Sequence, residues 1–213
     1  NRKRSAVLLR RDETVSIMIN EEDHIRIQCL NTGFQLENVW DLADKVDDVI
    51  EENVKYAFDE QLGYLTCCPT NVGTGIRASV MLHLPALTIT GYTKGMLQTI
   101  SKIGLTVRGL YGEGTEVAGN MFQLSNQLTL GQSEEEIINN LTTVTHQLVD
   151  REWAARENIA KHDRYGLEDK IYRSYGILSN ARKISSKEAM DLLSDVRMGV
   201  DMEILKEVDI NTI

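Results

Sequence analysis

Three short segments of this chain bring together residue types that can handle anions and protons. Cys67–Ser79 packs two thiols, several hydroxyls, two glycines and one arginine into thirteen residues. Asn20–Arg26 and Arg108–Gly114 each place carboxylates beside a guanidinium group. Arginine neutralises phosphate oxygens, and paired carboxylates can hold a planar guanidinium and accept a proton from it. We expect these segments to form one anion-handling site.

The first of the elements that must position these groups is a hairpin. His24–Cys29 alternates polar and apolar residues, so a strand there would carry Glu22 and Arg26 on one face and apolar side chains on the other. Val15–Ile19 is a second β-rich run, and Asn20–Asp23 is the expected connection. The apolar face would pack into the hydrophobic core, while the polar face would carry the functional side chains.

The remaining pattern predicts an α+β fold. Apolar spacing indicates an amphipathic helix over about 39–58 and another through 96–103, and two capping boxes, Ser133 with Glu136 and Ser185 with Glu188, open further helices. Further strands are expected at Tyr64–Cys67, Leu105–Arg108 and Met121–Leu130. We therefore predict an antiparallel sheet flanked by helices in residues 1–155, followed by an all-α segment in 156–213, the two joined by a continuous helix.

Composition narrows the classes of partner. The net charge is −9 and the pI about 5.0, which argues against non-specific binding of nucleic acid, because that needs clustered positive charge. The longest apolar stretch, Ser79–Ile89, is interrupted by His83 and Pro85 and is too short to span a membrane. Three cysteines, one of them necessarily unpaired, indicate a reducing cytoplasm, and no Cys/His spacing suggests a zinc site.

The three segments, in this order and spacing, resemble the catalytic half of the phosphagen (guanidino) kinases, the family of arginine and creatine kinases. The similarity runs from about Ser16 to at least Gly131 and is strongest to the bacterial protein-arginine kinase branch, which the segment Tyr172–Leu178 also fits. Three separated motifs are far more specific than a lone glycine loop. The chain resembles an N-terminally incomplete guanidino kinase catalytic domain followed by part of a helical dimerisation or regulatory domain.

The resemblance implies a role for each matching residue. Glu22 and Glu113 would hold the substrate guanidinium, with Glu113 as the base, and Cys68 would lie against it in an electrostatic, non-nucleophilic role. Arg26, Arg77 and Arg108 would clamp the phosphates of ATP, which arrives with Mg²⁺. No protein metal ligand is assigned. The residues that would line the nucleotide are Arg26, Arg77, Ala78, Ser79, Val80, Met81, Arg108, Gly109, Leu110, Tyr111, Gly112 and Glu113.

Some positions depart from the family pattern. Met81 stands where many members have histidine, and Gln123 where they often have aspartate, which affects adenine and metal contacts. An early Ser/Arg-rich strand has no match in Asn1–Val15, and an Arg-rich phosphoarginine-recognition segment is not found before Ile213. We expect the chain to be truncated at both ends.

The favoured function is an ATP-dependent protein-arginine kinase that marks proteins with exposed arginine for Clp-type proteolysis during stress. It would work with an activator protein and as a homodimer formed through the helices beyond Ala155. Two alternatives stay open: a kinase for free arginine or another small guanidino compound, and a non-catalytic binding or regulatory module that keeps the fold.

Overall fold

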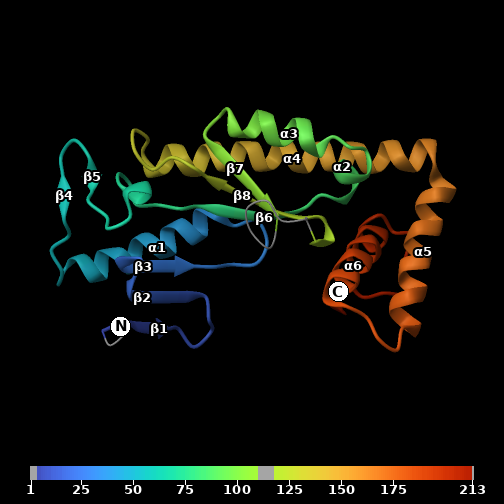
Figure 1. Ribbon diagram of the computed structural model, residues 1–213, viewed down its shortest axis with the longest axis horizontal. Coiled ribbons are helices and arrows are strands. Elements are labelled where there is room, and N and C mark those ends of the chain that lie inside the picture. Colours follow the sequence, from blue (N-terminus) through green and yellow to red (C-terminus); the bar gives the residue numbers. More distant parts are fainter. Residues whose placement is uncertain (1–3, 110–117, 213) are drawn as a thin grey trace. The chain divides into compact units, whose positions relative to one another are not determined.

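The computed structural model describes residues 4–109 and 118–212 (Figure 1). Its strands are β1 (Ala6–Leu9), β2 (Val15–Glu21), β3 (Asp23–Cys29), β4 (Phe58–Asp59), β5 (Gly63–Tyr64), β6 (Ser79–His83), β7 (Leu105–Gly109) and β8 (Met121–Asn126). Its α-helices are α1 (Leu36–Glu51), α2 (Pro85–Ile89), α3 (Thr93–Ser101), α4 (Glu134–His162), α5 (Arg164–Asn180) and α6 (Ser186–Asp201), and short 3-10 turns lie at Pro69–Asn71, Ala118–Asn120 and Ile210–Thr212. Within these ranges, no helix combines the length and apolar character needed to cross a membrane.

The described chain divides into two compact units. The first contains residues 4–80 and 125–142, and the second contains 81–124 and 143–212. Helix α4 runs without a break from the first unit into the second and through residue 155, as the predicted continuous helix requires. The proposed catalytic and helical domains, 1–155 and 156–213, remain a prediction.

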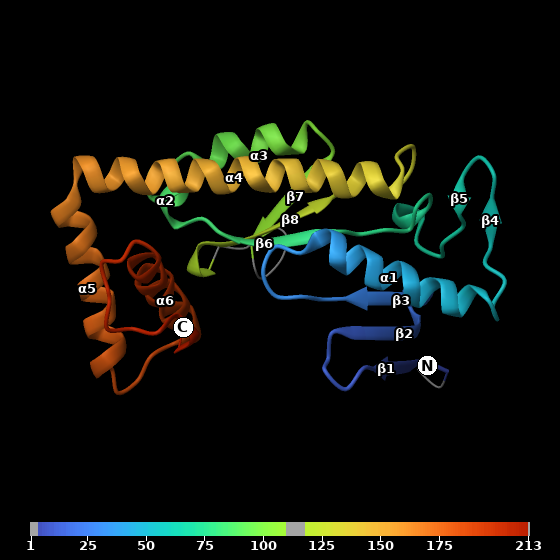
Figure 2. The same ribbon diagram turned by 180° about the vertical axis from the view of Figure 1, so that it is seen from behind.

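The first unit contains the predicted hairpin. Strands β2 and β3 pair antiparallel from Val15 with Cys29 to Glu21 with Asp23, and the unpredicted strand β1 adds to the other edge of β2. The expected four-residue connection is wrong, because pairing continues until Glu22 alone stands at the apex. Strand β3 carries exposed His24 and, like helix α1 beside it, contributes half-buried apolar residues to this unit (Figures 1 and 2).

The helix expected over 39–58 ends earlier, at Glu51. The chain then folds back, and Phe58 enters the short strand β4, which pairs with β5. The turn is stabilised by the Tyr56 hydroxyl, which donates a 2.8 Å hydrogen bond to Asp47 on α1. The strand expected at Tyr64–Cys67 is shorter, because β5 ends at Tyr64 and only a 2.8 Å backbone hydrogen bond from Leu65 to Ala57 extends the pairing.

Most of a three-stranded sheet in the order β6-β8-β7 lies in the second unit, where α3 packs against β7. Strand β8 ends at Asn126, four residues before the expected end, and α3 ends at Ser101. In the same unit, α5 and α6 lie side by side around a core of Leu167, Ile171, Val196, Met198 and Leu205. The α+β fold class is therefore confirmed.

Both predicted capping boxes open helices. Ser133 Oγ accepts a 3.1 Å hydrogen bond from the Glu136 N–H, and Glu136 accepts in return from the Ser133 N–H at 2.9 Å. Ser185 Oγ accepts from the Glu188 N–H at 3.2 Å. Each box satisfies amides that the first helical turn leaves without a partner, which explains why the sequence predicts these starts correctly.

A buried ion-pair network holds the second unit together. Glu152 accepts hydrogen bonds of 3.0 Å from the backbone amides of Ala86 and Leu87 at the start of α2, and it accepts a 2.7 Å bond from Arg156. Arg156 also donates to Asp201 at 3.1 Å. Breaking a buried pair leaves an uncompensated charge, so we regard this network as structural.

His83 lies close to this network, and because its side chain is half-buried we expect the protein to lose stability in acid. Its Nε2 is 2.8 Å from Ser194 Oγ, and burial, followed by the charge of Arg156, lowers its pKa from 6.5 to about 4. The unfolded chain therefore takes up the proton first, so stability falls as pH drops from 6.5 towards 4. We expect a loss of roughly 1 kcal/mol between pH 7 and pH 5.5 in urea unfolding, and a smaller loss for His83→Gln. Equal pH slopes for both proteins would contradict this.

Candidate active site

The turn between β2 and β3 holds two carboxylates against one guanidinium. Arg26 Nη1 donates a 3.0 Å hydrogen bond to Glu22 Oε2 and also pairs with Glu21. The Glu22 side chain is 49% exposed and that of Arg26 is 32% exposed, so solutes can reach both. Arg26, expected at phosphate, therefore pairs here with the acids, and Glu22 already binds the functional group that a guanidino substrate presents.

The backbone at the turn is strained. Glu22 has a φ of +58° and Asn20 a φ of +54°, in the left-handed region that residues other than glycine rarely adopt. Such conformations cost on the order of 1 kcal/mol each and concentrate at functional sites. The strained conformation places Glu22 at the apex of the hairpin, between the paired residues Glu21 and Asp23.

Asp23, directly after Glu22, ties this turn to the cysteine segment. Its Oδ1 accepts a 3.0 Å hydrogen bond from the Cys68 N–H, and its Oδ2 accepts a 2.7 Å bond from the Asn71 side chain. Burial alone would raise the pKa of this carboxyl, but the hydrogen bonds from Asn71, Cys68 and Cys67 and the charge of Arg26 hold the pKa below 3.8. Asp23 is therefore ionised and only 9% exposed, and it links the Asn20–Arg26 turn to the cysteine segment. We call it the clamp between these two motifs.

The clamp sets the position of Cys68. Pro69 begins a 3-10 turn for which Cys68 is the N-cap, and the Cys68 sulfur lies 3.0 Å from Thr70 Oγ1. Cys68 is half-buried and unbridged, as an orienting thiol requires. The neighbouring Cys67, in contrast, is exposed.

The first glycine that follows, Gly73, allows a close approach of two backbone segments. Gly73 has a φ of +114°, and a Cβ there would lie 2.1 Å from the Thr129 carbonyl oxygen. Thr129 Oγ1 in turn donates to the carbonyls of Thr70 and Val72 at 3.0 and 2.7 Å. Gly73 is therefore required for packing, and the loop from Cys68 to Gly73 is fixed at several points.

Asn126 pins the backbone on both sides of Arg77. Its Oδ1 accepts a 2.9 Å hydrogen bond from the Ala78 N–H, and its Nδ2 donates to the Ile76 carbonyl at 3.1 Å. Asn126 is 4% exposed, whereas Arg77 is exposed. The guanidinium of Arg77 thus projects from a rigid base.

The predicted nucleotide-lining residues 77–81 alternate between exposed and less exposed side chains as the chain enters β6. Ser79 and Met81 are exposed like Arg77, whereas Ala78 is buried and Val80 is half-buried. A strand sends successive side chains to opposite faces, so only the exposed set can offer side chains to a ligand. Ala78 and Val80 could contribute only through their backbone.

The remaining site residues belong to the second unit or lie outside the described residues. Arg108 and Gly109 are the last two residues of β7 and are half-buried, and Gln123 is half-buried on β8. Leu110, Tyr111, Gly112 and Glu113 lie outside the described residues. Of the predicted catalytic groups, the structure therefore brings together Glu22, Arg26 and, through Asp23, Cys68.

Comparison with known proteins places this geometry in a family. Residues 1–155 match the model of the ATP:guanido phosphotransferase C-terminal catalytic domain. The chain belongs to this family. Residues 164–213 also match the model described as the protein-arginine kinase McsB C-terminal domain. The resemblance inferred from the three motifs is confirmed, and the family to which the chain belongs is that of the ATP:guanido phosphotransferases.

Curated relatives lie in the same branch. The chain is 55% identical over 209 residues to the protein-arginine kinase of Clostridium kluyveri, covering 98% of this chain and 61% of the relative. It is 58% identical over 206 residues to that of Brevibacillus brevis, covering 97% and 58%. The chain therefore spans about three fifths of the length of these relatives.

A solved structure shares the fold. The duplicated taurocyamine kinase from Schistosoma mansoni, with bound transition-state analogue components, superposes with a TM-score of 0.65 at 24% identity. The match covers 86% of this chain and 28% of that one. At this identity the likeness concerns the fold alone.

Replacing Asn126 is expected to weaken ATP binding measurably. In Asn126→Ala the buried Ala78 amide loses an acceptor, so we expect a loss of about 2 kcal/mol of stability, and the KM for ATP to rise about tenfold because Arg77 loses its fixed base. Thermal unfolding and steady-state kinetics measure the two effects. Gln127→Ala, an exposed neighbour, is the control. An unchanged KM for ATP in Asn126→Ala would show that Asn126 has no role in positioning the nucleotide site.

Proposed function

We propose that this chain contains the catalytic part of an ATP-dependent protein-arginine kinase, which moves the γ-phosphoryl group of ATP to arginine side chains of proteins. The observation that supports this most strongly is the 55% identity, over 98% of the chain, to a protein-arginine kinase. The match of residues 164–213 to the C-terminal domain model of such kinases supports the same branch.

The proposed chemistry assigns one task to each type of group in the site. Glu22 holds the guanidinium of the substrate, and Cys68, positioned by Asp23, lies against its non-reacting side. Glu113 takes the proton from the attacking nitrogen, which makes a lone pair available for the new N–P bond while the bond to the leaving ADP oxygen breaks. Because a guanidinium stays protonated at neutral pH, transfer needs both this base and rigid alignment.

The phosphates need positive charge around them. We assign this to Arg26, Arg77 and Arg108, with the nucleotide lined by residues 77–81 and 108–113. Phosphoryl transfer depends mainly on such positioning and neutralisation. Arg77 and Ser79 are exposed on one side of the chain segment entering β6, which fits this role.

We further propose that Mg²⁺ arrives with the nucleotide. Within residues 4–109 and 118–212 no group of three or more His, Cys, Asp or Glu side chains could hold a metal ion. The proposal rests on the chemistry of Mg²⁺, which commonly binds through one or two carboxylates, waters and the substrate's own phosphates. When bound, it neutralises phosphate charge.

The wider setting is also a proposal. Residues 1–155 would act as the catalytic domain and 156–213 as part of a helical dimerisation or regulatory domain. The marked proteins would pass to a Clp-type protease under stress, with an activator protein controlling the kinase. The free thiols of Cys29, Cys67 and Cys68 fit a reducing cytoplasm.

Transfer of labelled phosphate from Mg-ATP tests the proposal. An unfolded arginine-rich protein and free arginine are offered side by side to the complete gene product and to this chain, and acid-labile, base-stable label is counted. Label on the protein is expected. Label on free arginine alone would make this a small-guanidino kinase, and no label from the complete protein would leave a binding or regulatory module.

A further inference from the structure

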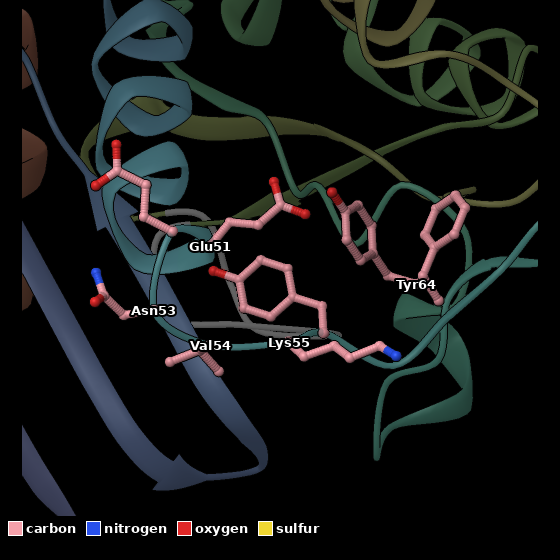
Figure 3. Close-up of a pocket in the computed structure, with 8 residues that line it drawn as sticks. Glu51, Asn53, Val54, Lys55 and Tyr64 are labelled. Carbon is pink, nitrogen blue, oxygen red and sulfur yellow. The ribbon is translucent and has the colours of Figure 1, made fainter.

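A hollow of about 630 Å³ lies at the C-terminal end of α1 (Figure 3). Its lining combines three aromatic side chains with two carboxylates and one ammonium group. The lining residues are Glu51, Glu52, Asn53, Val54, Lys55, Tyr56, Phe58 and Tyr64. This volume is within the range of ordinary ligand sites, so a side chain as long as arginine or lysine can enter it.

The aromatic wall has a fixed geometry. The Tyr64 ring meets Phe58 at a centroid distance of 5.2 Å and Tyr56 at 5.9 Å, both edge to face. Tyr56 is further held by its hydrogen bond to Asp47. Phe58 is 59% exposed although it belongs to this cluster, so apolar ring surface remains open to a ligand. Aromatic rings of this kind attract cations through their quadrupole.

The charge around the rings is negative. Burial first, and then the charges of Asp47, Glu51, Glu134 and Asp44, raise the pKa of Tyr64, so these carboxylates act on the rings. Among the lining residues, the cation is Lys55, which is exposed. The hollow therefore offers a cation both aromatic surface and carboxylate oxygens.

The same aromatic pair also reaches the cysteine segment. A second hollow of about 200 Å³ shares Phe58 and Tyr64 with the first and is bounded on another side by Gly73 and Thr74. Tyr64 is joined to Gly73 by a 2.8 Å backbone hydrogen bond from the Tyr64 N–H. A polypeptide at Cys68 could therefore continue over this hairpin into the aromatic hollow.

We propose that the aromatic hollow binds a second cationic side chain, arginine or lysine, of the polypeptide whose first arginine is phosphorylated. This inference rests on the proposed function and adds a determinant of substrate choice. Tyr64, Phe58 and Glu51 contact the second cation, while the catalytic groups act on the first.

The test uses peptides in a Gly/Ser background with the complete gene product. One series has a single arginine, and the others add arginine, lysine or glutamine two to six residues away on either side. At the best spacing a second arginine or lysine is expected to lower KM about tenfold with kcat unchanged, whereas glutamine has no effect. Glu51→Gln and Tyr64→Leu should each remove this advantage while leaving kinetics on the single-arginine peptide unchanged.

Glu37→Gln, which removes an exposed acid at the opposite end of α1, is the matched control and should keep the advantage. Transfer to single-arginine peptides without any gain from a second cation would overturn the inference and leave the proposed function standing. A gain that survives in both Glu51→Gln and Tyr64→Leu would also overturn it. No transfer to any peptide would remove the proposed function and the inference with it.

Discussion

Replacing Asp23 by asparagine is expected to lower kcat for protein phosphorylation about a hundredfold. The carboxylate accepts from the Cys68 amide and the Asn71 side chain at once, and an asparagine there must turn a donor towards one of them. One buried donor then has no acceptor, which costs about 2 kcal/mol, and the cysteine loop loses its position relative to Glu22. Stopped-time phosphorylation assays below the melting temperature measure the loss.

The exchange Asp23→Asn with Asn71→Asp separates this role from general instability. In the double variant the side-chain amide at position 23 can accept from the Cys68 N–H through its oxygen. Its nitrogen can donate to the new carboxylate at position 71, so both hydrogen bonds return. We expect the double variant to recover most of the lost kcat. If Asp23→Asn loses stability but keeps its kcat, Asp23 supports the fold without positioning Cys68.

Replacing Glu22 by glutamine should have the largest effect on transfer among the residues described. Glutamine keeps the shape but removes the charge that holds a guanidinium, so we expect kcat to fall by roughly 10² to 10⁴ with ATP binding retained. Phosphorylation kinetics and an ATP-binding titration measure the two quantities.

Glu21→Gln is the matched control for this prediction. Glu21 and Glu22 both pair with Arg26, and their side chains are 55% and 49% exposed, so either substitution removes one negative charge from the same partner. Only the Glu22 variant is expected to lose transfer. Equal losses would show that both acids act through Arg26 and not on the substrate.

Local patterns in the sequence predict several elements correctly. The alternation around Arg26 predicts β3 and its pairing with β2, and the reciprocal spacing of Ser133 and Glu136 predicts the start of α4. These predictions succeed because strand pleating and the free amides of a first helical turn involve residues close in sequence. The ends of elements are less predictable: Tyr56 leaves the helix pattern because it packs back on Asp47 and Tyr64.

The amino-acid sequence by itself determined the family and the α+β class, and it predicted which acids, arginines and thiol form the candidate site. Only the tertiary structure decided that Asp23, one of three acids in a row, is buried and clamps Cys68, and that Asn126 braces Arg77. Neither residue differs in sequence from an ordinary turn or strand residue. Their partners lie 45 and 48 residues away along the chain, and burial with hydrogen bonding at that separation is set by packing.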